Sequence, residues 1–367
     1  MLDLLEQQRE SIKKRTEKKK GHLFPPKVIQ TPIDHTHPSP SLQEKKIGCL
    51  VMAGGQATRL EANCPKGVIP FSPINHKSPL QIISEKILAF SICYNTTVPT
   101  AIMTSEVSHK EICDHFKAND FFGLENVSFF AQRSLPLLDM EMNPIFDKEG
   151  HLITGSDGNG SLFLACAPII QQWEDEGIEI ISIIQVDNPL IDPFHPAVLS
   201  PLFSGHDIVA AAVPRKDRSE QVGIFVQEED RTTVIEYSEL PQNALDGAFK
   251  WANISFFATT IAFAKKAASH KLTMHTARKR FQGREVWKNE YFIFDHLPFA
   301  ENPAIVQIDR ASFFAPIKNK TGPDSIETAQ KAMIEKDRQR LQEISKTLEE
   351  GAVELPQEAY YPVAHSF

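Results

Sequence analysis

The chain has 367 residues, of which 41% are hydrophobic and 23% charged, an ordinary composition for a globular protein. This length allows one large domain or two to three smaller ones. The net charge of -8 gives no electrostatic support to nucleic-acid binding, and no apolar stretch approaches the ~18 residues of a membrane span.

The five cysteines are scattered and form no C-x-x-C pair, which argues against a zinc site or a disulfide framework. Their use fits a reduced compartment, and the N-terminus lacks the apolar centre of a signal peptide. We therefore expect a soluble, cytoplasmic protein.

The first 20 residues combine many basic residues with interleaved acidic ones, which favours a solvated helix over a basic arm. Residues 21–45 are rich in proline and histidine and predict an irregular connector. His35 and His37 lie in this connector without further metal-ligand residues nearby, so surface histidines are expected there.

From residue 46, short apolar runs alternate with amphipathic segments. The runs are rich in β-branched or aromatic residues, which predicts buried strands at residues 46–54, 100–105, 127–132, 179–187, 207–214 and 304–310. Helices are expected at 78–90 and 160–177, the second ending at Gly177. This alternation predicts a mainly parallel sheet with helices on both faces and a ligand at the carboxyl ends of its strands.

The region from about 214 to 257 departs from that alternation and predicts an inserted β-ribbon formed by GIFVQ and TTVIEYSEL. Residues 325–351 predict a long polar helix for packing or partner contact. We accordingly divide the chain into an N-terminal helix and connector (1–45), a central domain (46–320) that carries the expected ligand site, and a C-terminal helical extension (321–367).

The stretch MAGGQATRLEANCPKG at residues 52–67 follows the first predicted strand. It is neither a Walker A loop nor a G-x-G-x-x-G fingerprint. A strand followed by A-G-G-x-x-T-R and then P-K instead suits a phosphate-binding loop. In such a loop the backbone of Gly54 and Gly55 approaches a nucleotide, while Arg59 and Lys66 neutralise a triphosphate.

Residues 50–67 resemble the signature of sugar-1-phosphate uridylyltransferases, specifically the eukaryotic-type UDP-N-acetylglucosamine and UDP-glucose pyrophosphorylases. Further stretches resemble family motifs in the family's order: FFAQRSLP, SDGNGSLF, VDN, VGIF with VIEYSEL, WANISFF and FFAPIKN. The resemblance covers residues 46–320. It implies a mixed, mainly parallel Rossmann-like (GT-A-type) nucleotidyltransferase sheet flanked by helices, with a β-ribbon sugar-binding insertion.

The resemblance implies transfer of uridylyl from UTP to a sugar-1-phosphate with release of pyrophosphate. Arg59 and Lys66 are expected to hold the UTP phosphates, and Lys318 to reach the α-phosphate or sugar phosphate from the other side. Asp187 ends a buried strand, where we expect it to bind Mg²⁺. The alternatives are surface cations for the three basic residues, and a turn or helix N-cap for Asp187.

The resemblance also assigns the nucleotide and the sugar. Ala53, Gly54, Gly55 and Thr58 would line the nucleotide, and the Gln132 amide would pair with the uracil edge. Gly158 and Asn159 would pass close to the base and ribose, although Asp, Gly and Asn also favour a simple tight turn. The expected sugar-binding residues are Gly223, Glu236, Tyr237 and Asn253, with Gly223 leaving room for an acetamido group.

Two positions depart from the family pattern, which has glycine where this chain has Ala57 and Glu61. Ala57 would strain the loop if its φ were positive. Glu61 places a negative charge near the triphosphate unless it points away or pairs with Arg59. These changes raise the prospect of altered substrate choice, low activity or a degenerate protein.

Four functions follow for testing. The first is an active UTP-dependent N-acetylglucosamine-1-phosphate uridylyltransferase, which EYSEL and PIKN favour. The second uses glucose-1-phosphate or a broader set of sugars, and the third is a non-catalytic UDP-sugar-binding protein. The fourth, a GT-A glycosyltransferase, needs a D-x-D motif that VDN does not supply. Retention of Arg59, Lys66, Asp187 and Lys318 together favours the two enzymes over the binding protein.

Overall fold

The structure is a computed structural model that describes residues 2–14, 23–30, 46–237, 239, 249–344 and 351–361. His35 and His37 lie outside the described residues. Within the described ranges, no helix is long and apolar enough to cross a membrane.

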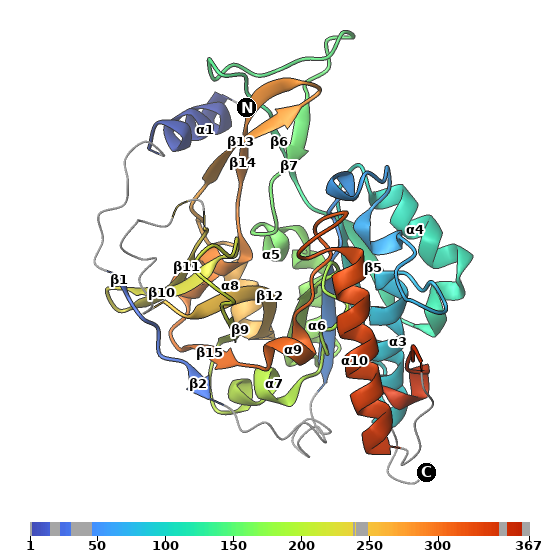
Figure 1. Ribbon diagram of the computed structural model, residues 1–367. Helices are drawn as coiled ribbons and strands as arrows, with labels where there is room; N and C mark the ends of the chain where they lie inside the picture. The colour runs from blue at the N-terminus through green and yellow to red at the C-terminus, as the bar shows by residue number, and fades with distance from the viewer. Residues whose placement is uncertain are drawn as a thin grey trace.

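An eleven-stranded sheet forms the centre of the molecule, with helices on both of its faces (Figure 1). Its main path runs in the order β2-β15-β9-β12-β8-β3-β4-β5. All six predicted strands are confirmed: β3 (Ile47–Met52), β4 (Thr100–Thr104), β5 (Val127–Ala131), β8 (Ile180–Gln185), β9 (Ile208–Pro214) and β15 (Pro303–Gln307). The neighbours among them pair in parallel, and their largely continuous apolar runs fit strands covered on both faces.

One central strand was not predicted. β12 (Trp251–Thr260) lies between β8 and β9 and runs antiparallel to both. Its pairing with β9 shifts register between Asn253 and Phe257, and Ser255 in this bulge has a φ of 56°. The sheet is therefore mixed but mainly parallel, as the family resemblance implied.

The predicted β-ribbon is the hairpin of β10 (Ile224–Glu228) and β11 (Arg231–Ile235), which joins the sheet where Ile224 pairs with Ala252. Parts of the expected irregular connector also join this sheet. β1 (Leu23–Phe24) pairs with β10, and β2 (Ile29–Gln30) runs parallel to β15. For these residues the prediction of irregular structure was wrong, because their backbones form hydrogen bonds with β10 and β15.

The N-terminal helix α1 (Leu2–Lys14) packs against a second hairpin, β13 (His275–Phe281) and β14 (Arg284–Glu290). Its Leu5 and Ile12 share an apolar cluster with Trp287. This contact, near the top of Figure 1, joins the first residues of the chain to a segment more than 260 residues later.

The expected helix at 160–177 is two helices, α5 (Leu162–Ala165) and α6 (Ala167–Asp175), which meet at Cys166. Pro168 explains the break, because proline cannot donate the backbone hydrogen bond of a helix interior and belongs in a first turn. Gly177 follows α6 with a φ of 80°, a conformation that suits a helix end.

The remaining helices cover the sheet and its strand ends. They are α3 (Pro79–Cys93), α4 (His109–Ala118), α7 (Pro196–Phe203), α8 (Ile261–Ala267), α9 (Arg310–Phe313) and α10 (Ile326–Ile344). A short ribbon pairs β6 (Ser134–Pro136) with β7 (Thr154–Ser156). The 3-10 helices are η1 (Thr58–Leu60), η2 (Lys66–Val68), η3 (Asp120–Gly123), η5 (Ile293–Phe299) and η6 (Gln357–Ala359). The predicted polar C-terminal helix is thus confirmed as α10 over Ile326–Ile344.

Candidate active site

The glycine loop leaves the carboxyl end of β3 and folds back on itself. The Ala53 N–H still belongs to the sheet, because it donates to the Met103 carbonyl at 2.7 Å. Beyond it, the Lys66 N–H donates to the Gly55 carbonyl at 3.0 Å, which closes the loop and places Lys66 beside the glycines. A Cβ added at Gly54 would lie 2.8 Å from Gln132 Oε1, so this glycine makes room for the glutamine amide.

The two departures from the family pattern are accommodated in different ways. Ala57 is buried and has a φ of -86°, which an alanine adopts without strain. Glu61 has the left-handed φ of 57° and forms an ion pair with Lys320 instead of Arg59. Its charge is therefore already paired. Thr58 and Arg59 lie exposed in η1, between these two positions.

Asp187 follows the carboxyl end of β8 and lies against the glycine loop. Its Oδ2 is 3.3 Å from Lys66 Nζ, and the two side chains are only 10% and 17% exposed. At such low exposure the ion pair is screened far less than a surface pair. The segments that follow two neighbouring parallel strands, β3 and β8, thus place opposite charges at the same edge of the sheet.

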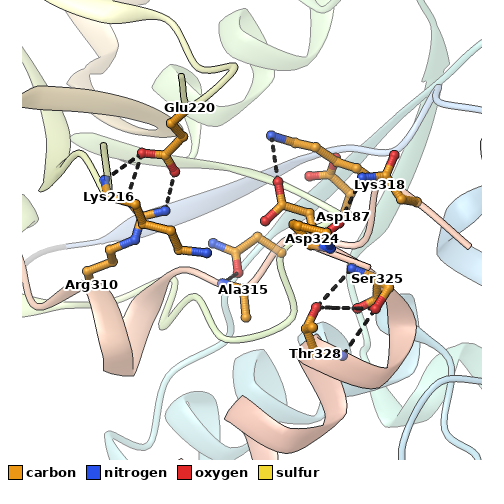
Figure 2. Close-up of polar contacts among 12 residues, drawn as sticks. Asp187, Lys216, Glu220, Arg310, Ala315, Lys318, Asp324, Ser325 and Thr328 are labelled. Carbon is orange, nitrogen blue, oxygen red and sulfur yellow. Dashed lines mark hydrogen bonds and ion pairs between the residues drawn. The ribbon is translucent and has the colours of Figure 1, made fainter. Parts of the chain in front are cut away.

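Lys318 reaches this edge because its segment is fixed to the residues around Asp187. The Ile317 N–H donates to the Asp187 carbonyl at 2.7 Å. The Asn188 side chain donates to the Phe313 carbonyl at 2.8 Å and accepts the Ala315 N–H at 3.1 Å. Figure 2 shows Asp187, Lys318 and Asp324 side by side, and Lys318 Nζ is 3.9 Å from Asp324 Oδ2.

The D-G-N-G loop packs against the end of the second hairpin. Gly158 has a φ of 84°, and a Cβ there would lie 2.3 Å from the Tyr291 carbonyl oxygen. The Asn159 Oδ1 accepts the Ile293 N–H at 3.0 Å. Both residues thus join this loop to residues 291–293. Gln132 is 8% exposed and lies at Gly54, so the predicted uracil-binding amide is next to the glycine loop.

Three of the predicted sugar-binding residues lie together. The Asn253 N–H donates to the Gly223 carbonyl at 2.8 Å, and a Cβ at Gly223 would lie 3.1 Å from Glu236 Oε1 and 2.8 Å from Val234. The space beside Gly223 is thus filled by the protein's own Glu236 and Val234. The glycine makes room for these neighbours, and its contact with an acetamido group stays a prediction. Tyr237, beside Glu236 in sequence, is 45% exposed.

Burial and the neighbouring charge of Glu239 raise the pKa of Glu236 to about 7, against the opposing positive charges of His275 and Lys318. The positive charge of Lys318 therefore acts on Glu236, one of the predicted sugar-binding residues, as well as pairing with Asp324. Burial lowers the pKa of His275, but its hydrogen bonds to Asp295 and Glu239 outweigh this and raise it to about 10. His275 thus remains a cation at neutral pH.

Sequence reasoning did not identify His275, and no motif signals it, because its carboxylate partners come from distant segments. It also missed the ion pair between Arg310 and Glu220 at the left of Figure 2. Arg310 further donates to the Pro214 carbonyl at 2.7 Å, so this pair joins α9 to the loop that precedes Gly223. A fourth residue, Asp157, is buried, and its Oδ1 has no hydrogen-bond partner among the described residues.

The donor set around Asp187 limits the kind of metal site that is possible. Among the described residues, no group of three His, Cys, Asp or Glu side chains is placed to hold an ion. Mg²⁺ commonly binds through one or two carboxylates together with substrate phosphates and water. Asp187 therefore fits an ion that arrives with a nucleotide, and does not fit an ion held by protein ligands alone.

The chain is similar in sequence to several known proteins. UDP-N-acetylglucosamine diphosphorylase 1 of Arabidopsis thaliana is 30% identical over 314 residues, which cover 77% of this chain and 62% of the relative. UDP-N-acetylhexosamine pyrophosphorylase-like protein 1 of Homo sapiens is 30% identical, covering 79% of this chain and 64% of that protein. The chain thus spans less than two thirds of the length of these relatives.

The fold has a close counterpart among solved structures. The uridine diphosphate N-acetylglucosamine pyrophosphorylase from Trypanosoma brucei superposes with a TM-score of 0.81 at 23% identity, covering 94% of this chain and 79% of that one. A family model described as UTP–glucose-1-phosphate uridylyltransferase matches residues 4–356. The chain therefore belongs to the UTP–glucose-1-phosphate uridylyltransferase family.

Proposed function

We propose that this protein transfers uridylyl from UTP to N-acetylglucosamine-1-phosphate, giving UDP-N-acetylglucosamine and pyrophosphate. The observation that carries the proposal is the meeting of Lys66, Asp187 and Lys318 at one edge of the sheet, from three distant segments. A protein that only bound a UDP-sugar would have little need for this complete set of phosphate-handling groups.

In the proposed reaction, a phosphate oxygen of the sugar phosphate attacks the α-phosphorus of UTP in line. A new P–O bond forms, the bond from the α-phosphorus to the bridging oxygen breaks, and pyrophosphate leaves with that oxygen. Both reactants are anions, so charge neutralisation and orientation dominate catalysis, and no side-chain nucleophile is needed. Lys66 and Arg59 would neutralise the departing pyrophosphate, while Lys318 would steady the phosphate at the centre of the exchange.

Asp187 would hold Mg²⁺, which when bound neutralises charge on the phosphates. In the free protein the carboxylate of Asp187 is paired with Lys66 Nζ at 3.3 Å. We propose that the pair keeps both groups in position until the nucleotide arrives. Lys66 would then turn from the carboxylate to the phosphates, so that neither charge lacks a partner before or after binding.

The choice of N-acetylglucosamine rests on the similarity of the chain to relatives named for that sugar. In the proposed pocket, Glu236 would accept hydrogen bonds from sugar hydroxyls, and Asn253 and Tyr237 would lie at its border. Glucose-1-phosphate, or a broader set of sugars, is the alternative that the family's name suggests. Five free thiols support a reducing compartment such as the cytoplasm as the place of reaction.

A pyrophosphate-release assay with UTP and Mg²⁺ tests the proposal. Glucose-, N-acetylglucosamine- and N-acetylgalactosamine-1-phosphate are compared at equal concentration, with a no-sugar control and an EDTA control. We expect release only with a sugar-1-phosphate, fastest with N-acetylglucosamine-1-phosphate, and lost in EDTA. Turnover with glucose-1-phosphate alone would overturn the sugar assignment. UDP-sugar binding without turnover of any of the three would favour the non-catalytic alternative.

A further inference from the structure

The C-terminal helix α10 lies against all three segments that carry the phosphate-handling residues. Its Ala329 and Met333 belong to one apolar cluster that also contains Leu60 of the glycine loop, Leu190 beyond Asp187 and Ile317 beside Lys318. The Gln330 side chain donates to the Phe71 carbonyl at 2.6 Å, which adds a polar contact from the same helix. Figure 1 shows α10 running along the molecule beside α3. The predicted packing helix therefore packs against the segments that carry the site.

Two lysines bind the loop that follows Asp187. Lys86 of α3 donates from Nζ to the Pro189 carbonyl at 2.6 Å and to the Ile191 carbonyl at 2.8 Å. Lys336 of α10 donates to the carbonyl between them, that of Leu190, at 2.7 Å. Three consecutive carbonyls of one loop are thus held by two cations from helices 250 residues apart in sequence.

Such an arrangement is costly for the lysines. Burial lowers the pKa of Lys86 to about 7 and that of Lys336 to about 8, although the carboxylates of Asp192 and Asp337 act in the opposite direction. Both lysines border a cavity of about 180 Å³. Apolar side chains of similar length would fill this region at lower desolvation cost. The ammonium groups form hydrogen bonds to the loop carbonyls, and apolar side chains could not form them.

We propose that Lys336 and Lys86 are positioning residues that fix the loop after Asp187, and thereby hold Asp187 and Lys318 at their proper separation. The loop directly follows Asp187 and Asn188, and these two residues form the backbone and side-chain bonds to the segment of Lys318. Loss of either lysine contact would therefore loosen both sides of the phosphate site. This inference rests on the proposed function.

Lys336→Met is the test variant because it keeps an unbranched side chain of similar length and removes the ammonium group, which donates to Leu190 and lies 4.3 Å from the centre of the Phe313 ring. Lys331→Met is the matched control on the same helix, since Lys331 is exposed and pairs only locally with Glu327. Lys336→Arg restores a donor. Each variant is compared with the natural protein by amide hydrogen exchange of residues 186–195 and 313–319, by thermal unfolding, and by kcat and KM in the pyrophosphate assay.

For Lys336→Met we expect exchange in both segments to be at least about tenfold faster and kcat to fall by roughly 10–100-fold, because small misplacements of reacting groups carry penalties of this size. Lys336→Arg is expected to recover most of the loss, and Lys331→Met to match the natural protein. Unchanged exchange and unchanged kcat in Lys336→Met would overturn the inference, as would a lower Tm with normal kcat per folded molecule.

If Lys336→Met does not fold, Lys86→Met takes the same test with the same criteria. The exchange measurement needs no turnover, so it separates this inference from the proposed function. A natural protein that is inactive with every sugar, combined with faster exchange in the variant, would sink the proposed function and keep the positioning role. An active natural protein, combined with unchanged exchange and kcat in the variants, would keep the proposed function and overturn the positioning role.

Discussion

Replacing Asn188 with alanine should weaken both the fold and the site. Asn188 is 1% exposed, and its amide is the side-chain link between the loop after β8 and residues 313–315. In Asn188→Ala, the Phe313 carbonyl loses a donor at 2.8 Å and the Ala315 N–H loses an acceptor at 3.1 Å. A buried polar group left without its partner costs about 1–3 kcal/mol.

The buried Phe313 carbonyl is such a group, so the free energy of unfolding should fall by about 1–3 kcal/mol, with a smaller further loss from the partly buried Ala315 N–H, which water can reach. Urea unfolding followed by tryptophan fluorescence measures this, and the midpoint should fall while the slope stays constant. Asn143→Ala is the control, because Asn143 is exposed and substitutions at such positions change stability by less than about 0.5 kcal/mol. A change in Asn188→Ala no larger than in this control would refute the assigned role of the amide.

Three further predictions follow from the same geometry. Lys66→Ala should lower kcat by at least ~10²-fold through lost stabilisation of the leaving phosphates, and near-normal turnover would remove Lys66 from the mechanism. Because the pKa of Glu236 is raised to about 7, its accepting, ionised form appears only as the pH rises through that value. The kcat/KM for the sugar phosphate should therefore rise between pH 6 and 8. In Glu236→Gln only the part of this rise that comes from ionisation of the substrate near pH 6 should remain. The same pH profile in the variant and the natural protein would contradict the role of Glu236. The same shift means that the contribution of Glu236 to folding stability declines from about pH 4.5 to 7, since the folded state binds the proton more tightly. Gly158→Ala should lower the free energy of unfolding measured in urea by more than about 2 kcal/mol. An alanine there would have an unfavourable φ, and its Cβ would collide with the Tyr291 carbonyl. Unchanged stability would show that this backbone contact is not rigid.

The sequence was informative where a pattern is local. The six strands were predictable because each is a short buried run with β-branched or aromatic residues, and the motifs fixed the neighbourhood of Lys66, Asp187 and Lys318. β12 was missed because its residues were interpreted as a sugar-binding motif alone, and antiparallel insertion into a parallel sheet has no local signal. The break at Cys166 was detectable in principle from Pro168.

The remaining features depend on contacts between distant segments. Nothing near Asn188 indicates that its side chain binds residues 313–315, and nothing in α10 indicates that Lys336 reaches Leu190. Gly223 illustrates the same limit. A glycine there was predictable as a site of close approach, but the approaching group is the protein's own Glu236. Arg59 lies exposed in η1, and its contact with phosphate stays a prediction.

A crystal structure with Mg²⁺ and a non-hydrolysable UTP analogue tests the central claim most directly. The account predicts a triphosphate between Lys66 and Lys318, the metal ion on the Asp187 carboxylate, and a Lys66 ammonium that has left Asp187 for the phosphates. An analogue bound elsewhere, or bound here with the contact between Lys66 and Asp187 intact and no metal ion on the carboxylate, would contradict it.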